Sequence, residues 1–145
     1  MLKEFLKPAK QEKGQALVEL AFVLPILLIL VFGIIEFGNI YYTNLTLNNA
    51  SREGARTGAI RATQHDVNLE GEIRQIIKTR VPSLDYNEVQ VYITPNSGDI
   101  ARGDDLKVEL RYNRRLLTPL FEPILDTSSN PGYIQLKSET TMRVE

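Results

Sequence analysis

Apolar residues form one continuous block near the N-terminus, and the remaining apolar residues recur in short periodic patterns. From Leu20 to Ile35 the chain has sixteen consecutive uncharged residues. A helix of about 20 apolar residues crosses the roughly 30 Å hydrocarbon core of a bilayer. The alternatives are a buried core helix and a cleaved secretory signal. The rest of the chain is too small to surround such a helix, and no Ala-x-Ala-like cleavage site follows the block. The pattern therefore predicts a retained transmembrane helix over residues 15–38.

A second periodic segment follows directly and predicts a helical stalk over residues 39–60. Its apolar and small residues recur at helical spacing and share one face: Ile40, Leu47, Ala50, Gly54 and Gly58. Small residues at these positions allow close approach of another element. We expect this face to pack on a sheet of the same chain, and contact with a neighbouring subunit is the alternative.

The rest of the pattern predicts a second helix and three strands. Asp66 is a candidate N-cap for a helix that runs to about Arg80, with Val67, Ile73, Ile76 and Ile77 facing inward. Apolar residues then alternate with polar ones in three runs, around Val89–Thr94, Leu106–Tyr112 and Ile134–Val144. A proline-flanked crossover, Leu116–Leu125, separates the second run from the third. The predicted fold class is α+β, with a long N-terminal helix, a second helix and a three-stranded antiparallel sheet.

Charge sets the expected orientation and limits the partners. Residues 1–13 hold four lysines and two glutamates, a net charge of +2. The positive-inside rule places this leader in the cytoplasm and residues after about 40 outside. Over the whole chain, 17 Lys and Arg balance 18 Asp and Glu, which argues against a nucleic-acid partner.

Composition argues against an enzyme and against a cofactor or metal. The chain has no cysteine and one histidine, His65, so thiolate metal sites, cysteine nucleophiles and multi-histidine sites are excluded. No phosphate-binding, zinc-protease or serine-hydrolase motif occurs. One loop gathers oxygen ligands that suit calcium, namely Asn96, Asp99, Asp104 and Asp105. Their spacing does not match an EF-hand, and solvated turn residues are the expected interpretation.

The start of the apolar block resembles a class III, prepilin-type signal. A short basic leader ends in Gly14, and Glu19 stands at the fifth position after it, inside the apolar segment. In that family a membrane aspartyl peptidase cleaves after the glycine on the cytoplasmic side, here between Gly14 and Gln15. The resemblance implies that Glu19 then pairs with the N-terminal ammonium of a neighbouring subunit, and a paired carboxylate is far less costly in the membrane than an unpaired one.

The resemblance extends over about 45 residues to TadE-like proteins of the tight-adherence (Flp) pilus system. It is carried by Gly14-Gln15-Ala16, Glu19, Pro25, Gly33, Glu36-Phe37-Gly38 and Asn49-Ala50-Ser51-Arg52-Glu53-Gly54-Ala55-Arg56. Leu20 stands where Tad pilins and pseudopilins often have an aromatic residue. The resemblance implies a pilin-like arrangement.

Together these observations predict a cytoplasmic leader (residues 1–14), a transmembrane helix (15–38) and an extracytoplasmic domain (39–145). The expected function is that of a non-catalytic minor pseudopilin or assembly component of a Tad/Flp pilus, without a cofactor or small-molecule substrate. Its expected location is the cytoplasmic (inner) membrane, as a single-pass protein that becomes pilus-associated after processing. Its expected partners are a prepilin peptidase, other Tad pilins or pseudopilins, the pilus assembly platform and membrane lipid. The alternatives are an unprocessed single-pass anchor with a small binding or sensing domain, and an enzyme that uses His65 or the loop aspartates.

Overall fold

The computed structural model describes residues 9–63, 68–95, 100–125 and 131–144. The chain divides into two compact units, Met1–Phe37 and Gly38–Glu145. Helix α1 (Ala9–Arg61) contributes to both units. The predicted α+β class is confirmed, since a long N-terminal helix is followed by further helices and a three-stranded antiparallel sheet.

The first unit is helical throughout its described part. Its large apolar side chains point outward along the whole apolar block, for example Phe22 at 74% and Ile26 at 69% exposed. This helix is long and apolar enough to cross a membrane, judged by its length and composition. A helix that is apolar on all sides is typical of a membrane span or of a helix that other protein surrounds.

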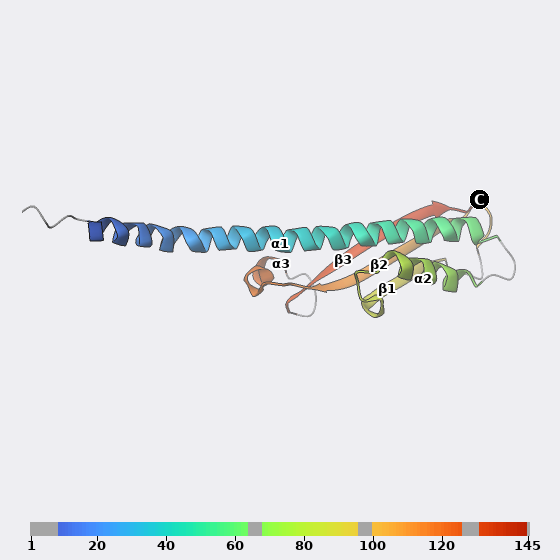
Figure 1. Cartoon of the computed structure of the whole chain (residues 1–145). Helices are drawn as coiled ribbons and strands as arrows, with labels where there is room; N and C mark the ends of the chain where they lie inside the picture. The colour runs from blue at the N-terminus through green and yellow to red at the C-terminus, as the bar shows by residue number, and fades with distance from the viewer. Residues whose placement is uncertain (1–8, 64–67, 96–99, 126–130, 145) are drawn as a thin grey trace, which may run out of the picture. The chain divides into compact units, whose positions relative to one another are not determined.

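The second unit is built on the sheet, whose strand order is β1-β2-β3 (Figure 1). The strands are β1 (Val89–Thr94), β2 (Asp105–Arg115) and β3 (Tyr133–Arg143). Both pairings are antiparallel, and Leu110 lies opposite Val91 on one side and Ser138 on the other. The alternation expected from the sequence is therefore confirmed, because Val91, Leu110 and Ser138 are all buried on one face.

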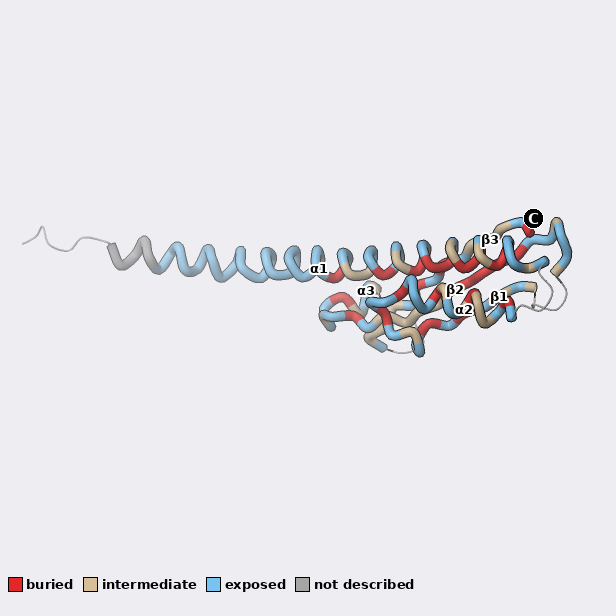
Figure 2. Tube along the Cα trace, turned by 45° about the vertical axis from the view of Figure 1, so that its right-hand side comes forward, coloured by how far each residue is buried: buried red, intermediate tan, exposed pale blue. Residues whose placement is uncertain are grey.

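The part of α1 within the second unit packs against that face. Leu47 and Ala50 are fully buried in the core cluster, and Ile40 is partly buried against it. Gly58 lies against Leu106 of β2 and against Ile73 of helix α2 (Leu69–Arg80). Figure 2 shows the buried residues of this part of α1 on the side that faces the sheet. The expected packing of the small-residue face on a sheet of the same chain is confirmed.

Helix α2 (Leu69–Arg80) begins later than the sequence predicted. Its N-cap is Asn68, whose Oδ1 accepts a hydrogen bond from the Gly71 N–H at 3.0 Å. The expected cap, Asp66, and the expected inward residue Val67 lie outside the described residues. The buried stripe is Leu69, Ile73 and Ile77, at i, i+4 and i+8, while Ile76 is only half-buried. The inward position assigned to Ile76 was therefore wrong, since the stripe through Leu69 turns Ile76 to the side.

The crossover between β2 and β3 has the irregular, partly helical form that its prolines predicted. It contains the 3₁₀ turn η2 (Pro119–Phe121) and the short helix α3 (Glu122–Leu125). Another 3₁₀ turn, η1 (Tyr86–Glu88), leads from α2 into β1, with the Asp85 carboxylate accepting a hydrogen bond from the Asn87 N–H. Phe121 and Leu116 are buried and fix the crossover to the unit.

Candidate functional site

Gly14, Gln15 and Glu19 lie within two turns of α1, in the first unit. Gln15 Nε2 donates a hydrogen bond to Glu19 Oε1 at 3.2 Å. The four-residue spacing places the two side chains on one helix face. The structure therefore brings together the residues that would become the first and fifth positions of a chain cleaved after Gly14.

The peptide bond between Gly14 and Gln15 lies inside the helix, because α1 begins at Ala9. A Cβ atom added to Gly14 would meet no atom within 4 Å. Glycine in a helix interior lowers helix stability by about 1 kcal/mol relative to alanine. Gly14 therefore lowers the stability of this part of the helix. Packing gives no reason for a glycine here.

The family-motif positions in the middle of α1 do not converge on one site. Pro25 lies inside the helix, where it removes the hydrogen bond to the carbonyl of Ala21. Glu36 is 1% exposed, whereas the neighbouring Phe37 is 55% exposed. A Cβ atom added to Gly38 would meet nothing within 4 Å.

The motif from Arg52 to Arg56 has an inner and an outer side. Gly54 lies against Ile77, since a Cβ atom added to Gly54 would be 3.1 Å from Ile77 Cγ1, and Ala55 is fully buried. Glu53 forms an ion pair with Arg80 of α2 at 3.3 Å. Arg52 and Arg56 are exposed, and among the described residues neither has an ion-pair partner. Packing accounts for the buried residues of the motif, and its exposed residues include two cations.

Sequence reasoning missed a polar contact that joins α1 to β3. The Ser51 hydroxyl lies 2.8 Å from the Ser138 hydroxyl and 2.9 Å from that of Thr140. Ser138 also donates to Asn48 Oδ1 at 2.6 Å. Ser138 and Thr140 both lie at the alternate positions of β3 that face inward. Two polar residues among otherwise apolar inward-facing positions were the signal in the sequence for this contact. The network is structural, because it satisfies hydroxyls that packing buries.

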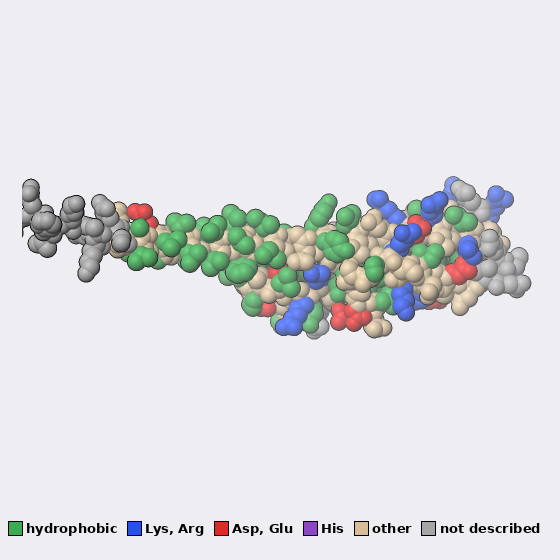
Figure 3. All heavy atoms as spheres, viewed as in Figure 1, with side chains coloured by type: hydrophobic (Ala, Val, Ile, Leu, Met, Phe, Trp, Pro, Cys, Tyr) green, Lys and Arg blue, Asp and Glu red, His purple; other side chains and the backbone are tan. Residues whose placement is uncertain are grey.

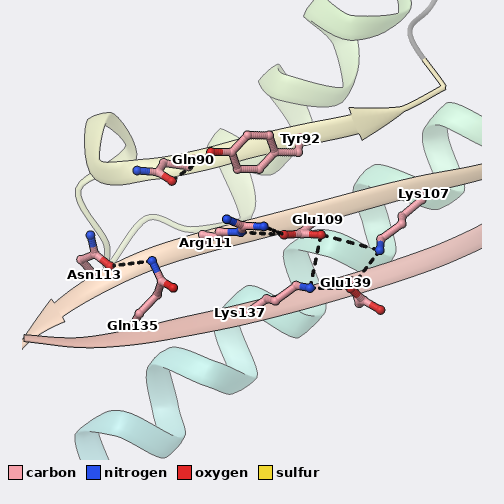
Figure 4. A network of polar contacts seen from close by, with 9 residues as sticks. All are labelled: Gln90, Tyr92, Lys107, Glu109, Arg111, Asn113, Gln135, Lys137 and Glu139. Atoms are coloured by element: carbon pink, nitrogen blue, oxygen red, sulfur yellow. Dashed lines mark hydrogen bonds and ion pairs between the residues drawn. The ribbon is translucent and has the colours of Figure 1, made fainter. Parts of the chain in front are cut away.

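A second cluster that sequence reasoning missed lies on the other face of the sheet (Figure 4). Glu109 is buried to 9% exposure between the cations Arg111, Lys107 and Lys137, at 2.6, 3.6 and 3.4 Å. Hydrogen bonds from Arg111 and then Lys137 hold the pKa of Glu109 below its ordinary value. Hydrogen bonds from Lys137 and Lys107 lower the pKa of Glu139 to about 2. The alternation of opposite charges along β2 and β3 was the available signal.

The candidate calcium loop is described only in part. Asp104 Oδ2 accepts a hydrogen bond from the Ala101 N–H at 2.8 Å, as a turn carboxylate does, and Asp105 begins β2. Asn96 and Asp99 lie outside the described residues, as does His65. Among the residues that the structure describes, no group of three His, Cys, Asp or Glu is placed to hold a metal ion.

Comparison with known proteins identifies the N-terminal segment. Residues 14–56 match the model of the TadE-like protein family. No curated protein and no solved structure matches the chain. The resemblance expected from the sequence is confirmed over this segment. The match begins at Gly14 and ends at Arg56, so it includes the apolar block and the packed motif but none of the strands.

Proposed function

We propose that this protein is a non-catalytic minor pseudopilin or assembly component of a Tad/Flp pilus. A prepilin peptidase cleaves it between Gly14 and Gln15, and one helix then holds it in the cytoplasmic membrane. The observation that carries the proposal is the family match, which begins at the glycine of the prepilin-type signal. The exposed apolar side chains of the first unit support the membrane anchor, because such a surface is costly in water.

The position of Glu19 supports a role after cleavage. Cleavage would create an ammonium group on the main-chain nitrogen of Gln15, the residue whose side chain contacts the Glu19 carboxylate. A carboxylate within the apolar segment costs about 2.5–3.5 kcal/mol at the bilayer centre, and a cationic partner offsets that cost. Glu19 and the ammonium of a neighbouring Tad pilin or pseudopilin would then fix the depth of one subunit against the next. The prepilin peptidase, these subunits and the assembly platform are the proposed partners.

The experiment is the intact mass of the membrane-extracted protein from cells with and without the prepilin peptidase. Loss of residues 1–14 that depends on the peptidase supports the proposal. The variant Gly14→Leu should retain the full-length mass in both cells. Gly38→Leu is the matched control, because Gly38 also lies in α1 with open space around its Cβ position, and it should be cleaved like the unmodified chain.

A full-length mass in both kinds of cell would contradict processing. It would favour the alternative of an unprocessed single-pass anchor whose extracytoplasmic domain binds or senses a partner. The two functions also predict different effects of a substitution at Glu19. For a pseudopilin, Glu19→Gln should be cleaved normally but recovered less with sheared pili or with cross-linked pilins. For an unprocessed anchor the same variant should change neither result.

The proposed topology places the leader in the cytoplasm and residues 39–145 outside. It is tested by single cysteines, because the chain has no cysteine of its own. Thr141→Cys, on an exposed position of β3, should react with a membrane-impermeant maleimide in intact cells or spheroplasts. In cells without the prepilin peptidase, where the proposed cleavage leaves residues 1–14 attached, Lys7→Cys should react only after the membrane is opened. The reverse pattern would contradict the topology.

A further inference from the structure

The crossover between β2 and β3 carries an apolar surface that the core does not use. Leu117, Leu120 and Ile124 are 55%, 52% and 77% exposed. We call these three residues the crossover patch. Pro119 and Pro123 beside them are also exposed. Contiguous exposed apolar residues of this kind mark an interaction surface more often than isolated ones do. Figure 3 shows hydrophobic side chains at the surface of the α3 region, with basic and acidic side chains beside them.

The crossover patch lies at a defined end of the second unit. Arg114, near the end of β2, donates a hydrogen bond to Thr43 Oγ1 at 2.7 Å. The Leu116 N–H, at the start of the crossover, bonds to the Gly132 carbonyl at 2.9 Å. The crossover therefore begins and ends at the same end of the sheet as the first turns of α1 in this unit, which starts at Gly38.

That end is where the chain enters the second unit from the apolar block. Only two residues separate Ile35, the last residue of the block, from Gly38. If the block spans the bilayer, as proposed above, the first turns of α1 in the second unit leave the membrane at its outer surface. The crossover lies at the same end of the second unit. The covalent connection of this end to the membrane-spanning block is then enough to hold the crossover near the headgroups. A lipid surface is then within reach of the crossover patch.

We propose that the crossover patch inserts into the outer interfacial layer of the membrane that holds the helix, as a second point of attachment. This inference rests on the membrane anchor in the proposed function. Apolar side chains of an interfacial element enter about 5–10 Å into the boundary between headgroups and acyl chains. Leu117, Leu120 and Ile124 supply that contact.

The residues around the crossover patch suit the headgroup layer. Arg115 is exposed beside the patch, where its guanidinium meets lipid phosphates. In the described part of the crossover the only carboxylate is Glu122, which is half-buried. At the same end, Tyr41 and Tyr42 are 70% and 53% exposed, and tyrosine is enriched at the interface between membrane and water.

The absence of tryptophan from the chain allows a direct test with single fluorescent reporters. The full-length protein is reconstituted in nanodiscs of zwitterionic and anionic phospholipid, with and without a lipid that carries a nitroxide quencher near its headgroup. Ile124→Trp reports on the crossover patch and barely disturbs packing, because Ile124 is 77% exposed. Ile60→Trp is the matched control, since Ile60 is a 55% exposed isoleucine near the other end of this part of α1.

Tryptophan at position 124 should emit at shorter wavelength than tryptophan at position 60. It should also be quenched at least about twofold more strongly by the nitroxide lipid, as an interfacial side chain is. Adding Leu120→Asp to Ile124→Trp should reduce that quenching. Equal quenching at positions 124 and 60 would overturn the inference. Blue-shifted but unquenched emission that depends on protein concentration would also overturn it, because it would assign the patch to a protein partner.

A third reporter separates this inference from the proposed function. Leu28→Trp lies in the middle of the apolar block and should be quenched by a nitroxide placed deep in the acyl chains. If it is quenched and position 124 is not, the membrane anchor stands and the second attachment is wrong. If position 28 is not quenched, the membrane anchor itself fails, and the inference that rests on it fails too.

Discussion

Gly58 is the position at which one added methyl group tests the packing of the second unit most directly. A Cβ atom at Gly58 would overlap Leu106 Cδ2 of β2 and would lie 2.8 Å from Ile73 Cδ1 of α2. Leu106 and Ile73 are both 0% exposed. Their methyl groups are the ends of flexible side chains, but full burial leaves them no free space to move into. We therefore expect Gly58→Ala to destabilise the second unit.

The magnitude follows from two opposing effects. Adding a methyl group to a filled core costs about 1–3 kcal/mol. Replacing glycine by alanine inside a helix returns up to about 1 kcal/mol. Because two fully buried side chains must shift, the upper half of the first range applies, and the net loss is about 1–2 kcal/mol. For a unit of this size, that lowers the melting temperature by about 5–10 °C.

Two further glycines provide an internal series. At Gly54 the added Cβ atom would lie 3.1 and 3.2 Å from the Ile77 side chain, and at Gly38 nothing lies within 4 Å. Gly54→Ala should therefore be close to neutral, and Gly38→Ala should be neutral or stabilising by up to about 1 kcal/mol. The order of stability should be Gly38→Ala, Gly54→Ala, Gly58→Ala, from the highest to the lowest.

The tyrosines make the measurement selective for the second unit. All six lie at or after Tyr41 and the chain has no tryptophan, so the tyrosine band in the near-ultraviolet circular dichroism of the detergent-solubilised protein reports this unit. A Gly58→Ala variant as stable as the unmodified chain would refute the packing. Ile73→Val removes the Cδ1 atom that the new methyl group meets, so the double variant should lose less stability than the two single losses added together.

Three more predictions concern polar contacts and one turn. Ser51→Ala removes one partner from the buried Ser138 hydroxyl, which keeps its hydrogen bond to Asn48, and should cost about 0.5–1.5 kcal/mol, read as a lower unfolding midpoint in denaturant. The depressed pKa of Glu139 means that its stabilising effect is complete above the ordinary value of 4.5 and is lost as the pH falls toward about 2. The melting temperature should therefore fall over that interval, and less steeply for Glu139→Gln. Gly103→Ala should cost about 1 kcal/mol or more by thermal melting, because φ there is +95°.

The helices and strands could be predicted because buried residues recur along each of them with the spacing of that type of element. In β1 and β2 the apolar residues Val91 and Leu110 lie at the alternate positions whose side chains are buried. In α1 the small residues lie on the helix face that packs against the core. Family resemblance supplied the positions from Gly14 to Arg56, which the family match covers. Both kinds of signal are local in sequence.

The parts that could not be predicted depend on residues far apart in sequence. The Arg114–Thr43 hydrogen bond joins residues 71 positions apart, and the Ser51–Ser138 contact joins residues 87 apart. No local pattern specifies which polar residues meet across a helix and a sheet. The start of α2 was misplaced for a different reason. Asp66 and Asn68 are both good N-caps, and burial of Leu69 favours the later one, which is a tertiary effect.

The motif Arg52–Arg56 shows how far folding alone accounts for a family pattern. Gly54 and Ala55 are explained by close packing, and Glu53 is explained by its ion pair with Arg80. Arg52 and Arg56 are exposed on one side of α1, and within the described residues neither pairs with a carboxylate. Exposed unpaired cations contribute little to the free energy of unfolding. Neither the packing nor the ion pairs of the described residues therefore explain why Arg52 and Arg56 stand in a segment that matches the TadE-like family.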